Sequence, residues 1–346
     1  MKKAFFINGG AGRVLCSIPA LEYYVKNTDP TAIIVVEAWI ELFLASPVLR
    51  ENVYPVTHKN LFKDKLFDRE IVTPEPYRLN AYFTQKANMI QAYDMLINNL
   101  VEVPETKSLN LDIGKNDQVY GYSMIDQIKS QTGKDKVVVF QPFGSGVRVQ
   151  GKFIIDESGR SFELKDVINI VKELSKYYAV IMFTDIKPML DQQIQAVMPE
   201  NANLLQWMSV IKAADYFIGC DSVGQHFANA LNKPATVVIG STFPENITYS
   251  SNKNFVIIDN GKDKRVYSPI RITADFFIDR GNEDLMVLAD STMDRLIKSV
   301  TNKLGKSAPK KQDLKPTQSV VSDSSCCPPP FSQKQLTSEI QSVIYK

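Results

Sequence analysis

Residues 216–231 read YFIGCDSVGQHFANAL, and this stretch decides the fold of the second half of the chain. Three apolar residues run into Gly219, a polar turn follows, and small residues at helical spacing come next. A short apolar run that enters a glycine-containing turn predicts a strand that ends where a helix begins. Asp221 and Ser222 are residue types that cap helix starts, so one explanation of this turn is purely structural.

The second explanation is an anion site. At a helix start, the backbone N–H groups of Ser222, Val223 and Gly224 attract anions, and the Ser222 hydroxyl adds another donor. His226, one turn further along, can donate to a phosphate or sugar oxygen, or can be an ordinary core histidine. These residues alone leave both explanations open.

Strands and helices alternate on both sides of this stretch. Apolar runs bounded by turn residues predict buried parallel strands at residues 4–7, 32–37, 137–140, 179–185, 215–220 and 234–242. Helical spacing predicts helices at residues 14–27, 81–100, 162–178, 188–198 and 285–304. This order predicts two doubly wound α/β domains, over residues 1–133 and 134–304, and the last helix can pack back on the first domain. Residues 101–135 are polar and weakly patterned, and they are expected to form the last elements of the first domain and the connection to the second.

Composition narrows the class of protein. The chain has 346 residues, 44% of them hydrophobic, and a net charge of +2, so it can bury a large core and needs no strongly basic face. That charge disfavours a nucleic-acid partner without excluding one. The apolar run Ala4 to Ile7 is too short for a signal peptide, and we expect a cytoplasmic protein with no transmembrane segment. The Ser/Pro/Lys-rich residues 305–346 predict a disordered tail that can bind a partner.

A glycine loop follows the first strand. Gly9, Gly10 and Gly12 lie between this strand and the next helix, at the sheet edge where ligands bind in open α/β folds. They either let a ligand approach the backbone or simply form a tight turn. The spacing lacks the third glycine of a dinucleotide fingerprint, which disfavours a nicotinamide-dependent oxidoreductase.

A longer loop follows the strand at residues 137–140. It carries Arg148, Lys152 and Arg160 and shows no strong pattern of its own, and long loops of this kind are usually functional. The three cations can converge on a phosphate group, or they can belong to a solvated basic loop.

Taken together, these stretches resemble the glycosyltransferase family of the ADP-heptose:lipopolysaccharide heptosyltransferases, family 9. The specific part is AADYFIGCDSVGQHFANALNKPATVVIGST, residues 213–242, and the less specific part is INGGAGRVLCSIPALEYY, residues 7–24. The resemblance covers residues 1–303. It implies a GT-B fold, in which two Rossmann-like domains face a cleft.

The resemblance also implies an activity, which is inverting transfer of a sugar from a nucleotide-diphosphate sugar with neither a metal nor another cofactor. The second domain would bind the donor diphosphate and the nucleoside, and the first would hold a saccharide or lipid-linked acceptor. The implied diphosphate residues are Asp221, Ser222, Val223, Gly224, His226 and Arg160, and the implied nucleoside residues are Gln206 and Trp207, after a strand ending in LLQW.

One position departs from the family. Arg13 stands where the family has the acidic residue that serves as its general base, and an arginine cannot deprotonate a hydroxyl at neutral pH. Glu37 is the predicted substitute, because it ends the second strand at the same sheet edge. Arg13 itself can meet a donor phosphate or an anionic acceptor. Two alternatives stay open: an impaired protein that only binds nucleotide sugars or assembles with a partner, and a glycosyltransferase that acts on modified DNA.

Overall fold

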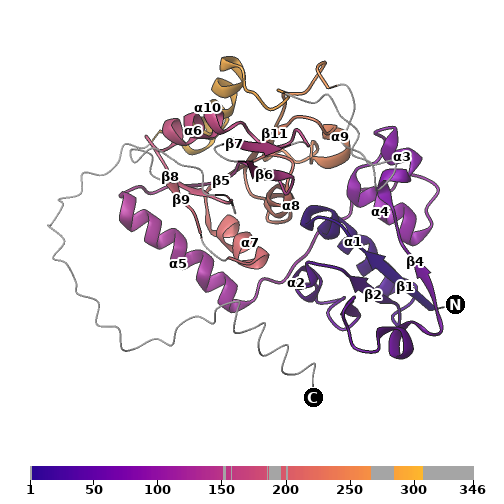
Figure 1. The fold of residues 1–346 in the computed structure, drawn as a ribbon. Coiled ribbons are helices and arrows are strands. Elements are labelled where there is room, and N and C mark those ends of the chain that lie inside the picture. The colour runs from indigo at the N-terminus through magenta and orange to yellow at the C-terminus, as the bar shows by residue number, and fades with distance from the viewer. Residues whose placement is uncertain are drawn as a thin grey trace, which may run out of the picture. The chain divides into compact units, whose positions relative to one another are not determined.

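The computed structural model describes residues 2–150, 153–156, 158–184, 186, 196–199, 202–265 and 284–306. Of the sequence predictions, residues 307–346 of the tail and most of the helix expected at 188–198 lie outside these ranges. Within them, no helix has the length and hydropathy that a membrane crossing requires. The predicted fold class is confirmed, since two parallel sheets with helices between their strands make up the described chain (Figure 1).

The first half forms a four-stranded parallel sheet in the order β3-β2-β1-β4. The central strand β2 is a continuous apolar run whose residues are all buried, as a parallel sheet covered on both faces requires, and its neighbour β1 contributes the buried residues Ala4, Phe5 and Ile7. The strands are β1 (Lys2–Ile7), β2 (Ile33–Val36), β3 (Val53–Pro55) and β4 (Arg69–Val72). The helices and helical turns that connect and cover them are α1 (Ala11–Asn27), α2 (Ile40–Leu44), η1 (Phe62–Leu66), η2 (Pro76–Arg78), α3 (Asn80–Phe83) and α4 (Met89–Asn98).

The second half forms a six-stranded parallel sheet in the order β12-β11-β10-β5-β8-β9. The strands that follow β5 are added first on one side of it and then on the other. As a result, β5 and β10 lie side by side at the centre of the sheet, and their carboxyl ends share one edge. The strands are β5 (Val137–Gln141), β8 (Ala179–Met182), β9 (Ala196–Val197), β10 (Tyr216–Gly219), β11 (Ala235–Ile239) and β12 (Phe255–Asp259). The helices are α6 (Leu164–Leu174), α7 (Leu204–Ala213), α8 (Val223–Ala230), α9 (Pro244–Ile247) and α10 (Asp290–Leu304).

The long helix predicted at residues 81–100 is two helices. Asn88 interrupts it, because its side chain accepts a hydrogen bond from the Gln91 amide while the Gln91 side chain accepts one from the Asn88 amide. This capping box starts α4 afresh after the short helix α3. The helical spacing of the apolar residues continued across the break and concealed it.

The segment at residues 101–135, in which no element bounds were predicted, contains the helix α5 (Lys115–Thr132). Its residues Gly121, Ile125 and Ile128 are buried, and most of its other side chains are polar, so the apolar pattern is weak. The helix packs against α7 of the second half. A second missed element is an antiparallel hairpin, β6 (Val147–Gln150) and β7 (Phe153–Asp156), within the loop that carries Arg160.

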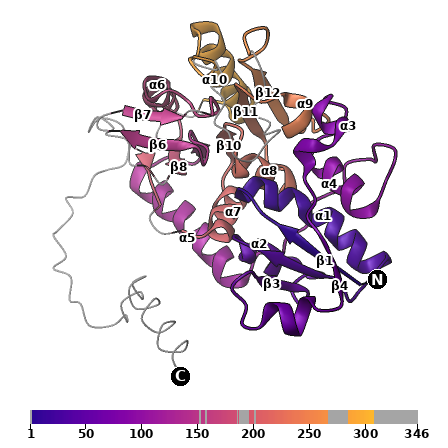
Figure 2. The same cartoon turned by 45° about the vertical axis from the view of Figure 1, so that its right-hand side comes forward.

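The terminal helix α10 packs on the second half. Its buried residues Leu296 and Val300 belong to the core that contains Val138 and Phe140 of β5, and α10 also contacts α6, β11 and β12. A return of this helix to the first domain, which the sequence left open, is therefore not the arrangement observed (Figure 2).

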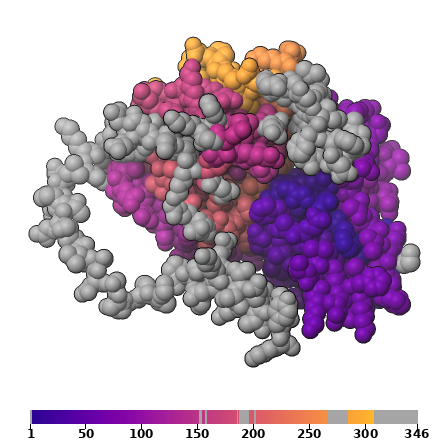
Figure 3. All heavy atoms as spheres, viewed as in Figure 1, coloured from indigo at the N-terminus to yellow at the C-terminus, as the bar shows by residue number. Residues whose placement is uncertain are grey.

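The two halves meet through α1 and α8, which pack against each other (Figures 1 and 2). One core cluster contains residues of both halves, including Val14 and Leu15 of α1 with Phe227 and Ala228 of α8. The surfaces of the two halves are accordingly in direct contact, as the indigo and salmon atoms of Figure 3 show. A cross-half hydrogen bond supports this interface, since Nδ2 of Asn246 donates to the backbone oxygen of Tyr82 at 2.8 Å.

The close approach of α5 to α7 gives a stability prediction. A Cβ on Gly121 would lie 2.3 Å from Oγ of Ser209 and 2.6 Å from its backbone carbon, so Gly121→Ala must push the helices apart. We expect a loss of about 1–3 kcal/mol in the free energy of unfolding, measured by urea denaturation. Ser123→Ala, at an exposed position of α5, serves as the control and should change it by less than about 0.5 kcal/mol. Equal stability of the two variants would contradict this packing.

Candidate functional site

A cavity of about 480 Å³ lies at the carboxyl ends of both sheets and is lined by both halves of the chain. Open α/β sheets bind ligands at this edge, because the helix starts point their free N–H groups toward it. The first half contributes Gly9, Gly10, Ala11, Gly12, Arg13, Trp39, Glu41, Tyr77, Tyr82 and Met89. Among the residues that the second half contributes are Gln141, Arg160, Phe183, Trp207, Asp221, Ser222, Val223 and His226.

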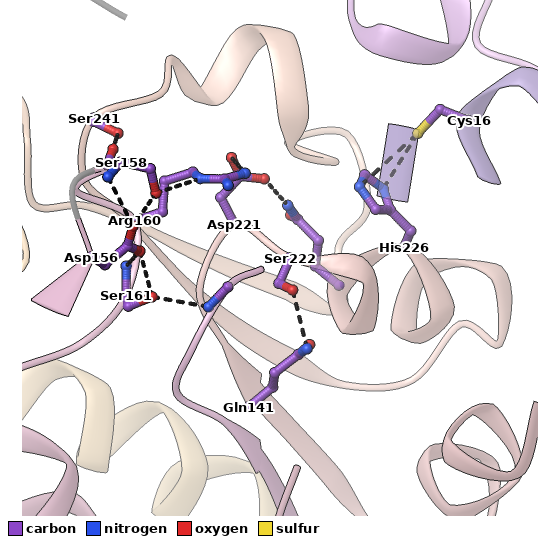
Figure 4. Close-up of polar contacts among 12 residues, drawn as sticks. Cys16, Gln141, Asp156, Ser158, Arg160, Ser161, Asp221, Ser222, His226 and Ser241 are labelled. Carbon is purple, nitrogen blue, oxygen red and sulfur yellow. Dashed lines mark hydrogen bonds and ion pairs between the residues drawn. The ribbon is translucent and has the colours of Figure 1, made fainter. Parts of the chain in front are cut away.

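The turn between β10 and α8 is capped by a residue from another strand. Oε1 of Gln141, at the end of β5, accepts a hydrogen bond from the Gly224 amide at 2.9 Å, and its Nε2 donates to Oγ of Ser222 at 3.1 Å. Ser222 is the N-cap residue of α8 but makes no capping hydrogen bond with its own side chain. The capping role expected for Asp221 and Ser222 thus belongs to Gln141, whose hydrogen bond to Ser222 is drawn in Figure 4.

Because of this cap, one of the three amides predicted to bind an anion is already hydrogen-bonded, and the other two belong to residues that line the cavity. The Gly224 amide is occupied by Gln141, and a Cβ on Gly224 would lie 2.3 Å from Oε1 of Gln141. Gly224 is therefore a packing requirement, and it is not among the cavity-lining residues. The amides of Ser222 and Val223 stand at the first turn of α8, where no intrahelical acceptor exists, and both residues line the cavity.

Arg160 is held beside this helix start. Its Nε donates to Oγ of Ser158 at 3.0 Å, and its Nη1 lies 3.7 Å from Oδ2 of Asp221. Asp156 organises the turn that carries it, because its carboxylate accepts from the amides of Ser158 and Ser161. Burial raises the pKa of Asp156, but hydrogen bonds from Ser158 and Ser161, with the charge of Arg160, lower it below the ordinary value. Figure 4 shows this network.

Asp221 is a buried carboxylate that is already engaged. It is 7% exposed, pairs with Arg160, and accepts a hydrogen bond from Nε2 of Gln225 at 3.1 Å. Burial raises its pKa above the ordinary value, although Arg160 opposes that shift. Asp221 therefore orients Arg160 toward the cavity, a role that suits the predicted diphosphate site without direct contact between two anions.

His226 faces the cavity from α8 at the junction of the two halves. Its Nδ1 lies 2.6 Å from Oη of Tyr249 and 3.7 Å from Sγ of Cys16, and a Cβ on Gly12 would lie 3.1 Å from its ring. Burial lowers the pKa of His226 to about 4, so the ring is neutral near pH 7. It can act as a hydrogen-bond donor at one ring nitrogen, but it cannot supply a positive charge.

Arg13 is bound within the first half. Its Nε donates to Oη of Tyr93 at 2.9 Å, its Nη2 pairs with Oε2 of Glu75 at 3.0 Å, and its guanidinium lies 5.0 Å from the ring centre of Tyr77. Burial lowers the pKa of Arg13, but Tyr93, Tyr77 and Glu75 raise it more, and the net shift is upward. Arg13 is thus a permanent cation in the cavity wall.

The glycine loop touches Arg13 directly. Gly9 has φ of +104°, and a Cβ there would lie 2.8 Å from Cδ of Arg13, so both the backbone angle and the contact require glycine. Gly10 and Gly12 line the cavity as well. All three glycines that the sequence singled out therefore stand at the site.

Glu37, the predicted substitute base, is not the glutamate that lines the cavity. Glu37 follows β2, as expected, but its side chain is exposed and it is not among the cavity-lining residues. Glu41, in the first turn of α2, does line the cavity. The chain turns after β2 before α2 begins, and this turn carries Glu41 rather than Glu37 into the cavity wall.

Of the two predicted nucleoside residues, only one lines the cavity. LLQW is the first turn of α7 and not a strand, because Asn203 and Gln206 form a capping box that starts a helix there. Gln206 is used in that box and is not among the cavity-lining residues, whereas Trp207 lines the cavity and stacks on Phe183 at 4.4 Å between ring centres.

Several site residues had no clear signal in the sequence. Gln141 was visible as a polar residue at a strand end, but its partner on α8 is 83 positions away. Trp39, Tyr77 and Phe183 resemble ordinary core or turn aromatics, and only the assembled fold brings them to the cavity. Of the residues that the sequence proposed for phosphate, Arg148 is exposed on the hairpin and Lys152 lies outside the described ranges.

One segment of the second half matches a known protein family. Residues 177–269 match the model of glycosyltransferase family 9 (heptosyltransferase), and this segment includes the whole of α8 and its turn. No curated protein matches the sequence. The part of the chain that the structure describes holds no group of His, Cys, Asp and Glu side chains placed to bind a metal ion.

Solved structures match over nearly the whole chain. The fold is similar to ADP-heptose LPS heptosyltransferase II of E. coli, with a TM-score of 0.56 and 15% identity over 87% of this chain and 98% of that one. It is similar to a family 9 glycosyl transferase of Veillonella parvula, with a TM-score of 0.53 and 13% identity over 87% and 96%. The iron-containing dodecameric glycosyltransferase TibC of enterotoxigenic E. coli gives 0.54 and 13% over 88% and 78%.

The chain therefore has the GT-B fold of sugar-nucleotide glycosyltransferases. It resembles glycosyltransferase family 9, whose model matches residues 177–269 within the second half.

The buried histidine gives a pH prediction. Because the pKa of His226 falls to about 4 in the folded state, from an ordinary value of 6.5, the unfolded chain binds one more proton between these values. The histidine's contribution is present above pH 6.5 and is lost as the pH falls toward 4, by about 3 kcal/mol in total. Urea unfolding between pH 4 and 7 should show a flatter profile for His226→Gln than for wild type. His58→Gln, which removes the chain's other histidine, is the control, and a flattened profile for both would refute the assignment.

Proposed function

We propose that this protein is a glycosyltransferase that moves a sugar from a nucleotide-diphosphate sugar to a saccharide or lipid-linked acceptor, with inversion and without a metal. The observation that carries the proposal is Arg160, held by Ser158 and Asp221 in the cavity wall that also contains the start of α8. A cytoplasmic location belongs to the same proposal.

The chemistry of the leaving group supports this assignment. A nucleoside diphosphate gains negative charge as the sugar leaves, so preorganised donors at that point stabilise the transition state. The amides of Ser222 and Val223 and the guanidinium of Arg160 are such donors, and they need no reorganisation because Gln141 and Ser158 hold their surroundings in place. Together they supply the neutralisation for which other enzymes use a bound cation.

Different residues would contact the nucleoside and the transferred sugar. Trp207, stacked on Phe183, offers an apolar wall for the nucleoside on the α7 side of the cavity. The neutral ring of His226 stands between the second half and the glycine loop, where a single N–H can donate to a phosphate or sugar oxygen. The first half then receives the acceptor.

The second candidate is a protein that binds a nucleotide sugar without transferring it, alone or in an assembly. The observation that favours it is Arg13, which stands in the cavity wall at the position of the family's base and is bound to Glu75 and Tyr93. A glycosyltransferase for modified DNA is the third reading, and the chain's net charge of +2 disfavours it.

A panel of nucleotides separates these candidates. Purified protein is titrated with UDP, GDP and ADP in a thermal-shift assay, and the corresponding sugar nucleotides are then tested for transfer and hydrolysis with EDTA present. Binding with release of the nucleoside diphosphate supports the transferase, and binding without release supports the second candidate. If no nucleoside diphosphate raises the melting temperature, both are excluded.

The arginine gives a specific prediction. Arg160→Ala should weaken binding of the preferred nucleoside diphosphate about 10- to 100-fold, because a charge-assisted contact to phosphate contributes about 1.5–3 kcal/mol. Arg160→Lys should restore little of it, since an ammonium cannot keep both Ser158 and a phosphate. Isothermal titration measures the affinities. Arg50→Ala, at an exposed arginine of the first half, is the charge-matched control, and equal weakening by it would reject a specific role for Arg160.

A further inference from the structure

Trp39 is held at the cavity in an unusual conformation. Its backbone has φ of 62° and ψ of 33°, a strained left-handed region that bulky residues rarely adopt. Its indole Nε1 donates to the backbone oxygen of Gly9 at 3.2 Å, which ties the start of α2 to the glycine loop. The residue nevertheless remains 37% exposed and lines the cavity. The fold thus retains a strained, partly exposed aromatic side chain at the site.

Glu41 lies two residues further along, in the first turn of α2, and lines the same cavity. Asp221 is the other carboxylate among the lining residues, and it is paired with Arg160 and hydrogen-bonded to Gln225. The carboxylate of Glu41 has no ion pair or hydrogen bond with any residue that the structure describes. Of the two acids, Glu41 is therefore the one that is free to accept a proton.

The surroundings of Glu41 also differ from those of the donor site. The amides of Ser222 and Val223 and the side chain of Arg160 belong to the second half, whereas Trp39 and Glu41 belong to the first half, where the Trp39 indole is bonded to the glycine loop. A sugar ring has an apolar C–H face and hydroxyl groups around its edge. An exposed indole can pack against the C–H face, and a free carboxylate can accept a hydrogen bond from a hydroxyl group.

We propose that Trp39 and Glu41 form the acceptor subsite, in which Trp39 packs against a saccharide ring and Glu41 is the general base. This rests on the proposed transferase function and names the residues and the acceptor class for its first half. The acceptor hydroxyl oxygen forms a bond to the anomeric carbon of the donor, and its proton passes to the Glu41 carboxylate. The bond between that carbon and the diphosphate oxygen breaks, and its electron pair leaves with the nucleoside diphosphate.

Arg13 takes a supporting part in this arrangement. Its bonds to Glu75 and Tyr93 keep it in the wall, and its stem packs on Gly9, whose carbonyl receives the Trp39 indole. Arg13 therefore positions the glycine loop, which in turn positions Trp39. A cation at this place is compatible with catalysis because the proton acceptor stands on α2 instead.

Binding of the saccharide can be measured without turnover. The chain has two tryptophans, of which Trp39 is 37% exposed and Trp207 is 9% exposed, so acrylamide quenching reports mainly on Trp39. The protein, saturated with its nucleoside diphosphate, is titrated with glucose, galactose, mannose and N-acetylglucosamine, each free and as the octyl glycoside. At least one should reduce quenching in wild type and none should do so in Trp39→Phe. If no saccharide protects Trp39, the subsite assignment is overturned.

Steady-state kinetics distinguish the role of Trp39 in acceptor binding from the role of Glu41 as the base. Trp39→Ala should raise the acceptor KM about 3- to 10-fold with little change in kcat, because it removes an aromatic contact. Glu41→Gln should lower kcat about 10²- to 10⁴-fold, remove the fall of kcat toward acidic pH, and leave nucleoside diphosphate affinity unchanged. Glu41→Asp should recover part of the rate. Glu51→Gln, at an exposed glutamate, is the control.

Three outcomes tell the proposals apart. Loss of transfer in Glu37→Gln with normal transfer in Glu41→Gln would overturn the assignment of the base and return it to the residue that the sequence suggested. Normal kcat in both variants would exclude either glutamate as the general base while the transferase function stands. Nucleotide binding and Trp39 protection with no transfer by wild type would instead defeat the transferase function and retain the saccharide subsite.

Discussion

The packing of α1 against α8 is the contact on which the site depends. Gly12 allows the ring of His226 to approach the first turn of α1, and Cys16 lies against the same ring one turn further on. This contact brings the glycine loop of the first sheet to the polar turn of the second, and a single apolar core runs through the junction. A Cβ at Gly12 would lie 3.1 Å from the ring of His226, so any larger residue at this position would require the two helices or the ring to shift.

Each half of the chain contributes one arginine to the wall of the cavity. Arg160 is oriented by Asp221 and Ser158 at the start of α8, and Arg13 is bound by Glu75 and Tyr93 beside the glycine loop. Each arginine is thus fixed by its own half before any ligand enters, which is the preorganisation that charge stabilisation in a transition state requires. The neutral state of His226 follows from its burial at the junction of the two halves, where it contacts Tyr249 and Cys16.

Much of this could be predicted from the sequence. The turn at residues 219–224 was recognised because a buried strand, a glycine and a small-residue helix are local patterns, and the three glycines after β1 were recognised for the same reason. The helix α5 was missed because only a few of its residues are buried. Glu41 was missed in favour of Glu37 because a turn after β2 changes which carboxylate reaches the cavity, and the Gln141 cap joins positions that no local pattern connects.

The sequence by itself determined the two parallel α/β units, the location of a polar site at their strand ends, and the resemblance to glycosyltransferase family 9. These follow from the periodicity of apolar residues and from short motifs, which act over one turn or one strand. Only the tertiary structure decided which amide of α8 is used for capping, which acid enters the cavity, and that Trp39 is held in its wall. Those choices depend on contacts between residues far apart in the chain, and such contacts exist only after α1 and α8 have packed together.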